Sequence, residues 1–259
     1  MESRIHSGRK PCAGHDSPHV KSSANARFIF RIEERVGNFV KRYDLRDKAI
    51  LEIGSGNGYL QDMVKNYTGL DIASTLARHY HKKFVVGSAT ALPFPDNSFD
   101  AIWSIWVFEH VPNPEQAFAE ARRVIKDGGV MFLLPAWNVP PWARTGYNIR
   151  PYEDLKWWEK VVKATIPLRA SITFQAVSTI PVRAVRAAVA GFGPTRLRYR
   201  RLEPNYERYW QADSDAVNSI DSHEAVLWFT TRGDECLSCR DSIILPLDGD
   251  ALIVRVNKR

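Results

Sequence analysis

Short apolar runs alternate with helically spaced apolar positions through the middle of the chain. The runs end at glycine or polar residues and predict buried strands at 49–53, 67–71, 84–87, 99–106 and 130–134. Helical spacing, caps and prolines predict helices around and between these strands, at 24–43, 59–65, 74–81 and from Asn113 to about Gly128. Strands separated by helices require crossover connections, so we expect a mostly parallel sheet that is covered on both faces.

The alternation ends after residue 135. Residues 139–212 hold helical patterns rich in Trp, Arg and Tyr, and two further β-type runs follow at 225–231 and 251–256. We expect these two runs to close the sheet as an antiparallel pair. The expected fold class is therefore α/β, with a seven-stranded, mostly parallel sheet, helices on both faces and a helical insertion between the fifth strand and the closing pair.

The same pattern divides the chain into parts. We expect a flexible leader at 1–23, a ligand-binding core at 24–138, a substrate cover at 139–212 and closing strands of the core sheet at 213–259. The leader contains Gly, Pro, Ser and His without periodicity, which is typical of a mobile terminus. We expect the cover to be an insertion in the same domain as the core.

The composition is that of one large α/β domain, with 259 residues of which 44% are hydrophobic and 25% are charged. The chain lacks a run of about 18 apolar residues, and residues 1–21 hold no apolar signal-peptide segment. We therefore expect neither a membrane-spanning helix nor secretion. Three cysteines are too few for a disulfide scaffold, so the reducing cytoplasm is the expected location.

Positive charge is concentrated in the expected cover. Residues 139–212 carry 13 Lys and Arg against 5 Asp and Glu, whereas residues 49–138 carry 7 against 9. This distribution fits an anionic ligand or a membrane surface better than a nucleic acid, which we do not expect as a partner. The apolar and basic segment 157–192 is typical of a cover packed on the core, and peripheral membrane contact is the alternative.

The sharpest motif joins the first expected strand to the next helix. Residues 51–58 are Leu-Glu-Ile-Gly-Ser-Gly-Asn-Gly, and alternating glycines let a backbone turn tightly and approach a ligand. A dinucleotide fingerprint would need its third glycine where Tyr59 stands, and Glu52 would repel a pyrophosphate. The loop therefore favours a cationic ligand.

An acidic residue, Asp71, ends the second expected strand 15 residues after Gly56. At this edge its carboxylate can accept hydrogen bonds from both hydroxyls of a ribose, and Ile72 offers an apolar face to an adenine ring. The alternative is a strand-end carboxylate that makes only turn hydrogen bonds.

Taken in order, these motifs resemble those of the class I S-adenosylmethionine-dependent methyltransferases, within the broad group of small-molecule enzymes. The matching segments are 51–58, Gly-Leu-Asp-Ile at 69–72, Ala-Leu-Pro-Phe-Pro-Asp-Asn-Ser-Phe-Asp at 91–100, Phe-Glu-His-Val-Pro-Asn-Pro at 108–114 and Arg-Val-Ile-Lys-Asp-Gly-Gly at 123–129. The resemblance covers residues 47–136. It implies a Rossmann-like fold, S-adenosylmethionine as the cofactor and S-adenosylhomocysteine as the product.

The resemblance also implies cofactor-binding roles, residue by residue. The methionine end of the cofactor would lie against Glu52, Gly54, Ser55, Gly56, Asn57 and Gly58, and the sulfonium above Ser104, Ile105 and Trp106. Asp71 would hold the ribose and Ile72 the adenine face, while the adenine edge would meet Ser88, Ala89 and Thr90. The family usually has Asp where Ser88 stands, so the bond to the adenine amino group would be a neutral one, or Thr90 would assist.

Methyl transfer to a hydroxyl is helped by a base within hydrogen-bond reach of the acceptor. His110 is the first candidate for this base, because it follows the fourth strand at the edge where open α/β sheets bind ligands. Glu109 is the second candidate. In the alternative interpretation His110 packs at the start of a helix and bonds a backbone carbonyl.

Five residues of the cover are candidate acceptor contacts: Arg196, Arg198, Arg200, Tyr206 and Tyr209. The alternating arginines would share one face of an extended strand and could grip phosphate or carboxylate groups, although a charged edge strand is an equal explanation. The tyrosines could line a pocket or serve ordinary packing.

The acceptor expected from a basic, aromatic cover is a small polar or anionic molecule that is methylated on oxygen, such as a sugar, a glycan or a natural-product precursor. A lipid or lipid-linked acceptor at a membrane surface is one alternative. A scaffold that binds the cofactor without turnover is another.

The cysteines leave one further hypothesis open. Cys236 and Cys239 form a C-x-x-C pair, and Cys12, His15 and His19 have the spacing of metal ligands, so together they could bind zinc. The two groups lie at opposite ends of the chain. We therefore favour plain loop thiols and expect no metal.

Overall fold

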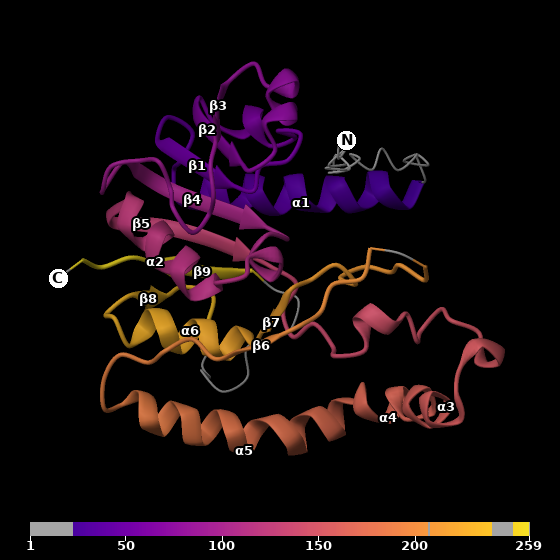
Figure 1. The fold of residues 1–259 in the computed structure, drawn as a ribbon. Coiled ribbons are helices and arrows are strands. Elements are labelled where there is room, and N and C mark those ends of the chain that lie inside the picture. Colours follow the sequence, from indigo (N-terminus) through magenta and orange to yellow (C-terminus); the bar gives the residue numbers. More distant parts are fainter. Residues whose placement is uncertain (1–22, 207, 240–250, 259) are drawn as a thin grey trace, which may run out of the picture.

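The computed structural model describes residues 23–206, 208–239 and 251–258. Its main sheet has the order β3-β2-β1-β4-β5-β9-β8 (Figure 1). The strands are β1 Ala49–Ile53, β2 Asn66–Asp71, β3 Lys83–Val86, β4 Phe99–Ile105, β5 Ile125–Leu134, β8 Glu235–Cys236 and β9 Leu252–Arg255. The first five are parallel, β9 is antiparallel to β5, and β8 is antiparallel to β9. The expected seven-stranded, mostly parallel sheet is confirmed.

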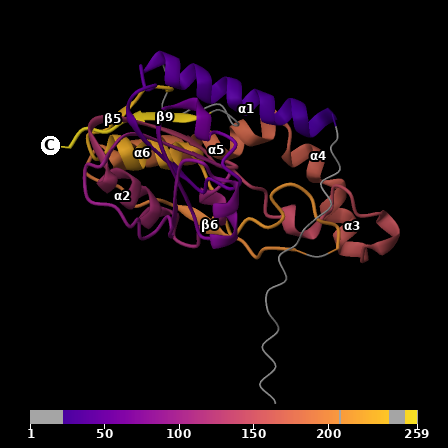
Figure 2. The same ribbon diagram turned by 90° about the horizontal axis from the view of Figure 1, so that it is seen from above.

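Helices cover both faces of the sheet, because successive side chains of each strand point to opposite sides. On one face, α1 (Ser23–Arg42) packs its Phe39 against Phe132 of β5. On the other face, α2 (Pro114–Val124) and α6 (Ser222–Thr230) bring together Phe118 and Phe229. Seen from above, α1 and α2 lie on opposite sides of the sheet (Figure 2).

The start of α2 follows its sequence signals. The side chain of Asn113 accepts a hydrogen bond from the amide of Gln116, and Pro114 occupies the first turn. The helix ends at Val124 rather than near Gly128, because Ile125 already pairs with Phe99 and begins β5.

Two expected helices are only short 3₁₀ turns, η1 (Gln61–Met63) and η2 (Ser74–His79). The pairing of Ala49 with Asn66 requires the chain to return along the whole of β1, about 16 Å at ~3.3 Å per residue. An α-helix over the expected 59–65 would span only ~10 Å. The expectation at 59–65 was therefore wrong because the connection is too short for a helix.

The expectation of a strand at 225–231 was also wrong. This run lies in α6, whose residues from Ser222 to Phe229 are all buried, and Asp221 caps it by accepting a hydrogen bond from the amide of His223. A helix that is buried on every side carries a continuous apolar run, which periodicity alone does not distinguish from a buried strand. The closing antiparallel pair is formed instead by β9 and β8.

The described residues between β5 and α6 contain four short helical elements, one long helix and one two-stranded ribbon. The helical elements are η4 Ala143–Thr145, η5 Tyr152–Asp154, α3 Trp157–Ala164, α4 Ile166–Arg169 and α5 Ile172–Ala190, and the ribbon pairs β6 Tyr199–Arg201 with β7 Asn218–Ile220. In Figure 1, α5 forms the outermost layer, with α6 between it and the sheet. None of the helices in the described ranges is long and apolar enough to cross a bilayer.

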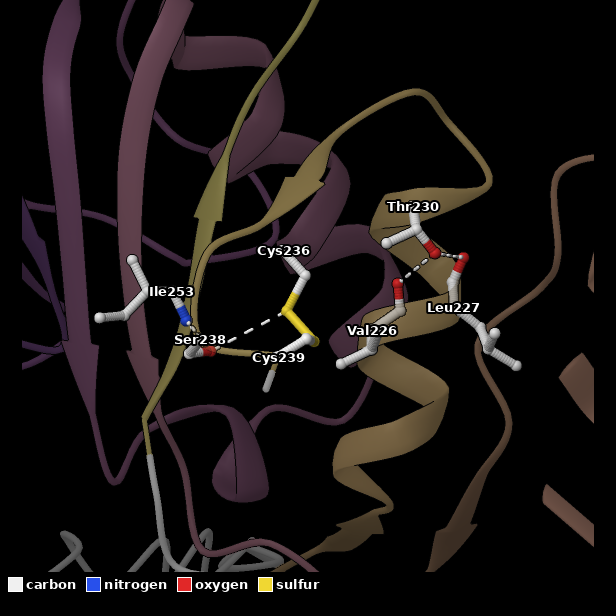
Figure 3. The surroundings of a disulfide bond; sticks show 7 residues. All are labelled: Val226, Leu227, Thr230, Cys236, Ser238, Cys239 and Ile253. Atoms are coloured by element: carbon white, nitrogen blue, oxygen red, sulfur yellow. Dashed lines mark hydrogen bonds between the residues drawn. A yellow bond between two sulfur atoms is a disulfide. The ribbon is translucent and has the colours of Figure 1, made fainter. Parts of the chain in front are cut away.

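Cys236 and Cys239 differ from the expectation of plain loop thiols, because they form a disulfide (Figure 3). Their Cα atoms are 5.5 Å apart, and the hydroxyl of Ser238 between them accepts a hydrogen bond from the amide of Ile253 in β9. As a disulfide the pair offers no thiolates to zinc. The other three residues of the zinc hypothesis, Cys12, His15 and His19, lie outside the described residues.

Two ion pairs, one of them buried on both sides, join α5 to α6. The guanidinium of Arg186 donates to both carboxylate oxygens of Glu224 at 2.7 and 2.6 Å, and Arg183 pairs in the same way with Asp221 at 3.1 and 2.8 Å. The side chains of Arg186 and Glu224 are nearly fully buried.

We predict that Glu224→Ala lowers the free energy of unfolding by about 3 kcal/mol, because removing one partner leaves a buried charge unpaired. Urea unfolding measures the change. The matched control is Glu235→Ala, which breaks the exposed pair with Arg255 and should cost less than ~1 kcal/mol. Equal effects of the two variants would contradict the assignment of Arg186–Glu224 as a structural link.

Candidate functional site

A cavity of about 360 Å³ lies at the carboxyl edge of the sheet. Its lining comes from the ends of β1 and β2, from the segment after β3 and from the turn after β4: Ile53, Gly54, Leu70, Asp71, Ile72, Gly87, Ser88, Ala89, Thr90, Trp106, Val107, His110, Val111 and Pro112. Strands β2 and β4 flank β1 on opposite sides, so the connections diverge here. Ligands of open α/β sheets bind at this kind of edge.

The glycine loop borders the cavity and is fixed by the neighbouring strand. The amides of Gly54 and Ser55 both donate to the carbonyl of Leu70, at 2.8 and 3.0 Å. Gly54 has a φ of 69°, and a Cβ at this position would lie 2.2 Å from the Cγ2 atom of Val107. A larger residue would therefore push the loop away from the turn after β4.

The carboxylate of Asp71 is held at the rim of the cavity by two backbone amides. Its Oδ2 atom accepts from Gly56 at 3.0 Å and its Oδ1 atom accepts from Ala73 at 3.1 Å. A carboxylate has about four lone-pair sites, so it can still accept from ligand hydroxyls. The adjacent Ile72 is 77% exposed, which leaves an apolar surface available for a flat ring.

The segment after β3 adds polar groups to the cavity lining. The hydroxyls of Ser88 and Thr90 lie 2.8 Å apart, and both residues line the cavity. They can hydrogen-bond the edge of a purine, as expected for the position where the resembled family usually has Asp. The cavity fits the nucleoside part of S-adenosylmethionine in three respects. These are its size, the carboxylate of Asp71 that can accept hydrogen bonds from ribose hydroxyls, and the apolar face at Ile72.

Trp106 marks the end of β4 and has an unusual backbone. Its φ of 52° is a left-handed conformation that bulky residues rarely adopt, and its amide donates to the carbonyl of Leu134 at 2.8 Å. Such outliers cluster at ligand-binding sites. Its side chain lies at the cavity, as the sequence predicted.

Several expected cofactor contacts lie elsewhere than in the cavity lining. Glu52 points to the α1 face of the sheet, where its carboxyl accepts a hydrogen bond of 2.5 Å from the hydroxyl of Tyr67. The buried Ser104 donates to the carbonyl of Ile53. The remaining positions outside the lining are Ser55, Gly56, Asn57, Gly58 and Ile105. Their predicted roles at the methionine and sulfonium end stay predictions.

Burial changes the protonation of Glu52. Loss of solvent raises the pKa of its carboxyl to about 7, although the hydrogen bond from Tyr67 acts in the opposite direction. The alternation of side chains along β1 explains the placement, because Glu52 shares its side of the strand with Ile50 in the core beneath α1.

Tyr80 supports the glycine loop, and sequence analysis missed it. Its hydroxyl lies 3.0 and 2.8 Å from the carbonyl oxygens of Ser55 and Gly56, and 2.7 Å from the hydroxyl of Ser55. A Cβ on Gly58 would lie 2.9 Å from its ring. Tyr80 belongs to none of the matching motifs, so the only signal in the sequence was an aromatic residue within the expected helix at 74–81.

His110 and Glu109 lie in η3 (Phe108–His110), at the turn after β4. His110 lines the cavity, its Nδ1 atom lies 3.3 Å from the carbonyl oxygen of Asp215, and its Nε2 atom lies 4.0 Å from Oε1 of Glu109. If Nδ1 carries the proton and donates to Asp215, Nε2 bears the lone pair that a base needs. Glu109 is buried, and burial raises the pKa of its carboxyl to about 7.

The segment at the start of β7 is hydrogen-bonded to the turn after β4 that contains His110. The amide of Val217 donates to the carbonyl of Glu109 at 2.9 Å. The side chain of Asn218 donates to the carbonyls of Phe108 and Val111 at 2.9 and 2.7 Å. The insertion is therefore held against the turn that carries His110.

The expected acceptor contacts lie apart from this cavity. Arg196, Arg198 and Arg200 are exposed while Leu197 is buried, but only Arg200 lies in a strand, β6. Tyr206 and Tyr209 line a second hollow of about 540 Å³ together with Arg144, Arg150 and Arg208. Each of these last three arginines pairs with a carboxylate. Within the described part of the chain, no group of three or more His, Cys, Asp or Glu side chains could hold a metal.

Comparison with known proteins gives three findings. Residues 51–133 match a family described as a methyltransferase domain. The chain is 27% identical over 186 residues to a fatty-acid O-methyltransferase of Mycolicibacterium smegmatis, which covers 64% of this chain and 67% of that protein. It is 32% identical over 139 residues to a phthiotriol/phenolphthiotriol dimycocerosates methyltransferase of Mycobacterium tuberculosis, which covers 49% of this chain and 46% of that protein.

A solved structure is similar over a larger share of the chain. It is an S-adenosylmethionine-dependent methyltransferase from Methanosarcina mazei, with a TM-score of 0.47 and 17% identity over 85% of this chain and 98% of that one. Against the sequence relatives, in contrast, the chain spans two thirds of the first protein and less than half of the second.

We predict that Asp71→Ala weakens the binding of S-adenosylhomocysteine by about 10- to 100-fold, because hydrogen bonds to a charged acceptor are lost. Isothermal titration calorimetry measures the affinity. Asp62→Ala removes an exposed carboxylate of η1 outside the cavity and should leave the affinity unchanged. An unchanged affinity in Asp71→Ala would contradict the assigned nucleoside position.

The raised pKa of Glu52 predicts a pH-dependent stability. The carboxyl titrates near 4.5 when unfolded and near 7 when folded, so the folded protein binds the proton more tightly. The stabilisation is complete below about pH 4.5 and is lost, by roughly 3 kcal/mol, as pH rises to about 7.

We therefore predict that Glu52→Gln makes the free energy of unfolding fall less between about pH 5 and about pH 8, measured by urea unfolding. Glu109→Gln should act in the same direction, and the double variant should combine both effects, since burial raises the pKa of Glu109 as well. A slope that Glu52→Gln leaves unchanged would contradict the buried placement of this carboxyl.

Proposed function

The chain is a class I S-adenosylmethionine-dependent methyltransferase, and we propose that it methylates an oxygen atom of a lipophilic acceptor, with His110 as the general base. The observation that carries this proposal is the position of His110. It lines the same cavity as Asp71 and Ile72, and it lies at the turn where the insertion returns to the sheet.

The cofactor, when bound, supplies an activated methyl group on a sulfonium. Asp71, Ile72, Ser88 and Thr90 would hold its nucleoside part at one end of the cavity. The role of the protein is then to bind, to orient and to exclude water. His110 takes the proton of an acceptor hydroxyl at Nε2, while the Asp215 carbonyl holds the ring through Nδ1.

Glu109 serves as a positioning residue in this proposal. Its carboxyl lies 4.0 Å from Nε2 of His110 and is buried, so its charge would stabilise the imidazolium that forms when His110 accepts a proton. Because burial raises the pKa of this carboxyl to about 7, it carries its negative charge mainly above that pH.

The lipophilic class of acceptor is supported by two observations. The relatives named above are a fatty-acid O-methyltransferase and a methyltransferase of phthiotriol lipids. The insertion, which contacts the turn that carries His110, exposes large apolar side chains, among them Trp157 and Val177. The sugar or glycan acceptor expected from the sequence is the second candidate, because three arginines gather in the hollow at Tyr206 and Tyr209.

We predict that the protein releases S-adenosylhomocysteine with a detergent-solubilised long-chain fatty acid or isoprenoid phenol, and more slowly with sugar phosphates or sugar acids. With the phenol, whose hydroxyl keeps its proton at neutral pH, His110→Ala should lower kcat by about 10²- to 10⁴-fold, the range typical of a lost general base, while calorimetry shows that cofactor binding is retained. His81→Ala, an exposed histidine paired with Asp62, is the matched control and should keep full turnover.

Two results would overturn parts of this proposal. Full turnover by His110→Ala would exclude His110 as the general base. Turnover with sugar acceptors alone would replace the lipophilic acceptor with the polar class.

A further inference from the structure

Helix α5 buries its charged side chains and exposes its apolar ones, which is the reverse of an ordinary surface helix. Its charged side chains, Arg183 and Arg186, face the protein and are the only ones buried among the described side chains of the helix. Its valines face solvent, and Val177 and Val185 are 78% and 64% exposed. An amphipathic helix of a globular protein normally buries its apolar stripe and exposes its charges.

This orientation is fixed by the ion pairs described above. Arg183 and Arg186 each donate two hydrogen bonds to a carboxylate near the start of α6. Arg186 also donates to the carbonyl of Arg196. Because both guanidinium groups point at α6, the rest of α5 is held away from the core, on the outer side of the molecule (Figure 1).

The apolar surface continues onto the neighbouring helices and past the end of α5. Trp157 of α3 is 79% exposed and Phe192, just after α5, is 93% exposed. We call the whole set the outer apolar face, which consists of Trp157, Trp158, Val161, Leu168, Phe174, Val177, Ile180, Val182, Val185, Val189 and Phe192. Monomeric proteins rarely expose so many large apolar side chains on adjoining helices, and such a surface marks an interaction site.

The charges around the outer apolar face have one sign. Residues 155–201 contain ten Lys and Arg but a single acidic residue, Glu159. Glu159 is buried and accepts hydrogen bonds from the amide of Lys156 and from Arg150. The exposed charges of this segment are therefore cationic, as at Lys160 and Arg169.

We propose that the outer apolar face lies on the surface of a lipid bilayer that contains anionic lipids. Apolar side chains, tryptophans and flanking cations are the combination that holds an interfacial helix at the boundary between headgroups and acyl chains. Anionic lipids attract each nearby Lys and Arg. A second copy of the chain fits less well, because two such faces would bring cations of the same sign together.

The inference goes beyond the proposed function, since it concerns where the protein binds rather than what it methylates. Bilayer binding at α3–α5 is measured without cofactor or acceptor. Turnover of a detergent-solubilised acceptor is measured without a bilayer. Failure of either proposal therefore leaves the other open to its own test.

The test uses the full chain and sedimentation with vesicles, either of phosphatidylcholine alone or of equal parts of phosphatidylcholine and phosphatidylglycerol. We expect binding to the mixed vesicles that weakens as salt is raised, and much weaker binding to phosphatidylcholine. The double variant Val177→Glu with Val185→Glu should lose about tenfold or more in binding, because each carboxylate would enter the apolar boundary.

The matched control changes the same two positions but keeps them apolar. Val177→Leu with Val185→Leu should bind the mixed vesicles at least as well as the wild type. Circular dichroism and the affinity for S-adenosylhomocysteine should be unchanged in both double variants, since Val177 and Val185 lie outside the cofactor cavity.

A second pair of variants tests the charge. Lys160→Glu with Arg169→Glu should weaken binding to the mixed vesicles and flatten its salt dependence. Lys65→Glu with Lys83→Glu makes the same change of net charge beside β2 and in β3, at the other end of the sheet, and should have little effect.

Three results would overturn the proposal. The first is no binding to the mixed vesicles. The second is equal binding by the wild type and by the variant with two glutamates. The third is a wild type that is dimeric in analytical ultracentrifugation while the variant with two glutamates is monomeric. A second copy of the chain would then be the occupant of the outer apolar face.

Discussion

The change of direction in strand order at β1 is the constraint on which the site depends. The chain builds β2 and β3 on one side of β1 and must then cross to place β4 on the other side. At the carboxyl edge, the chain after β1 leads toward β2 on one side, and the chain after β4 leaves on the other side. The cavity lies between these two connections. Asp71 arrives from one side and His110 from the other, so the proposed ribose ligand and the proposed base share one cavity although 39 positions separate them in the sequence.

The parts of this arrangement that depend on local sequence could be predicted. The strands from β1 to β5 are short apolar runs, Asn113 and Pro114 mark the start of α2, and the glycine loop and Asp71 have a characteristic spacing. The cavity contains seven of the fourteen positions expected to bind the cofactor, among them Asp71 and Trp106. Local geometry decides these positions, since each lies within a few residues of a strand end.

The parts that depend on distant contacts could not be predicted. The apolar run of α6 resembled a strand because the helix is buried on all sides, and Tyr80 gains its role only when the chain brings it to the glycine loop. The side of β1 on which Glu52 lies depends on which face α1 covers. Periodicity also predicted a cover packed on the core, whereas the two arginines of α5 turn its apolar side outward.

The proposed cofactor and acceptor sites share one cavity beside η3. The sheet edge there fits a nucleoside, and Asn218 donates hydrogen bonds from the insertion to the turn that carries His110. A crystal structure with S-adenosylhomocysteine bound tests this account most directly. It should show the ribose hydroxyls at the carboxylate of Asp71, the adenine against Ile72 and the sulfur on the side of Trp106 and His110. A nucleoside bound outside this cavity, or bound with its sulfur directed away from His110, would contradict it.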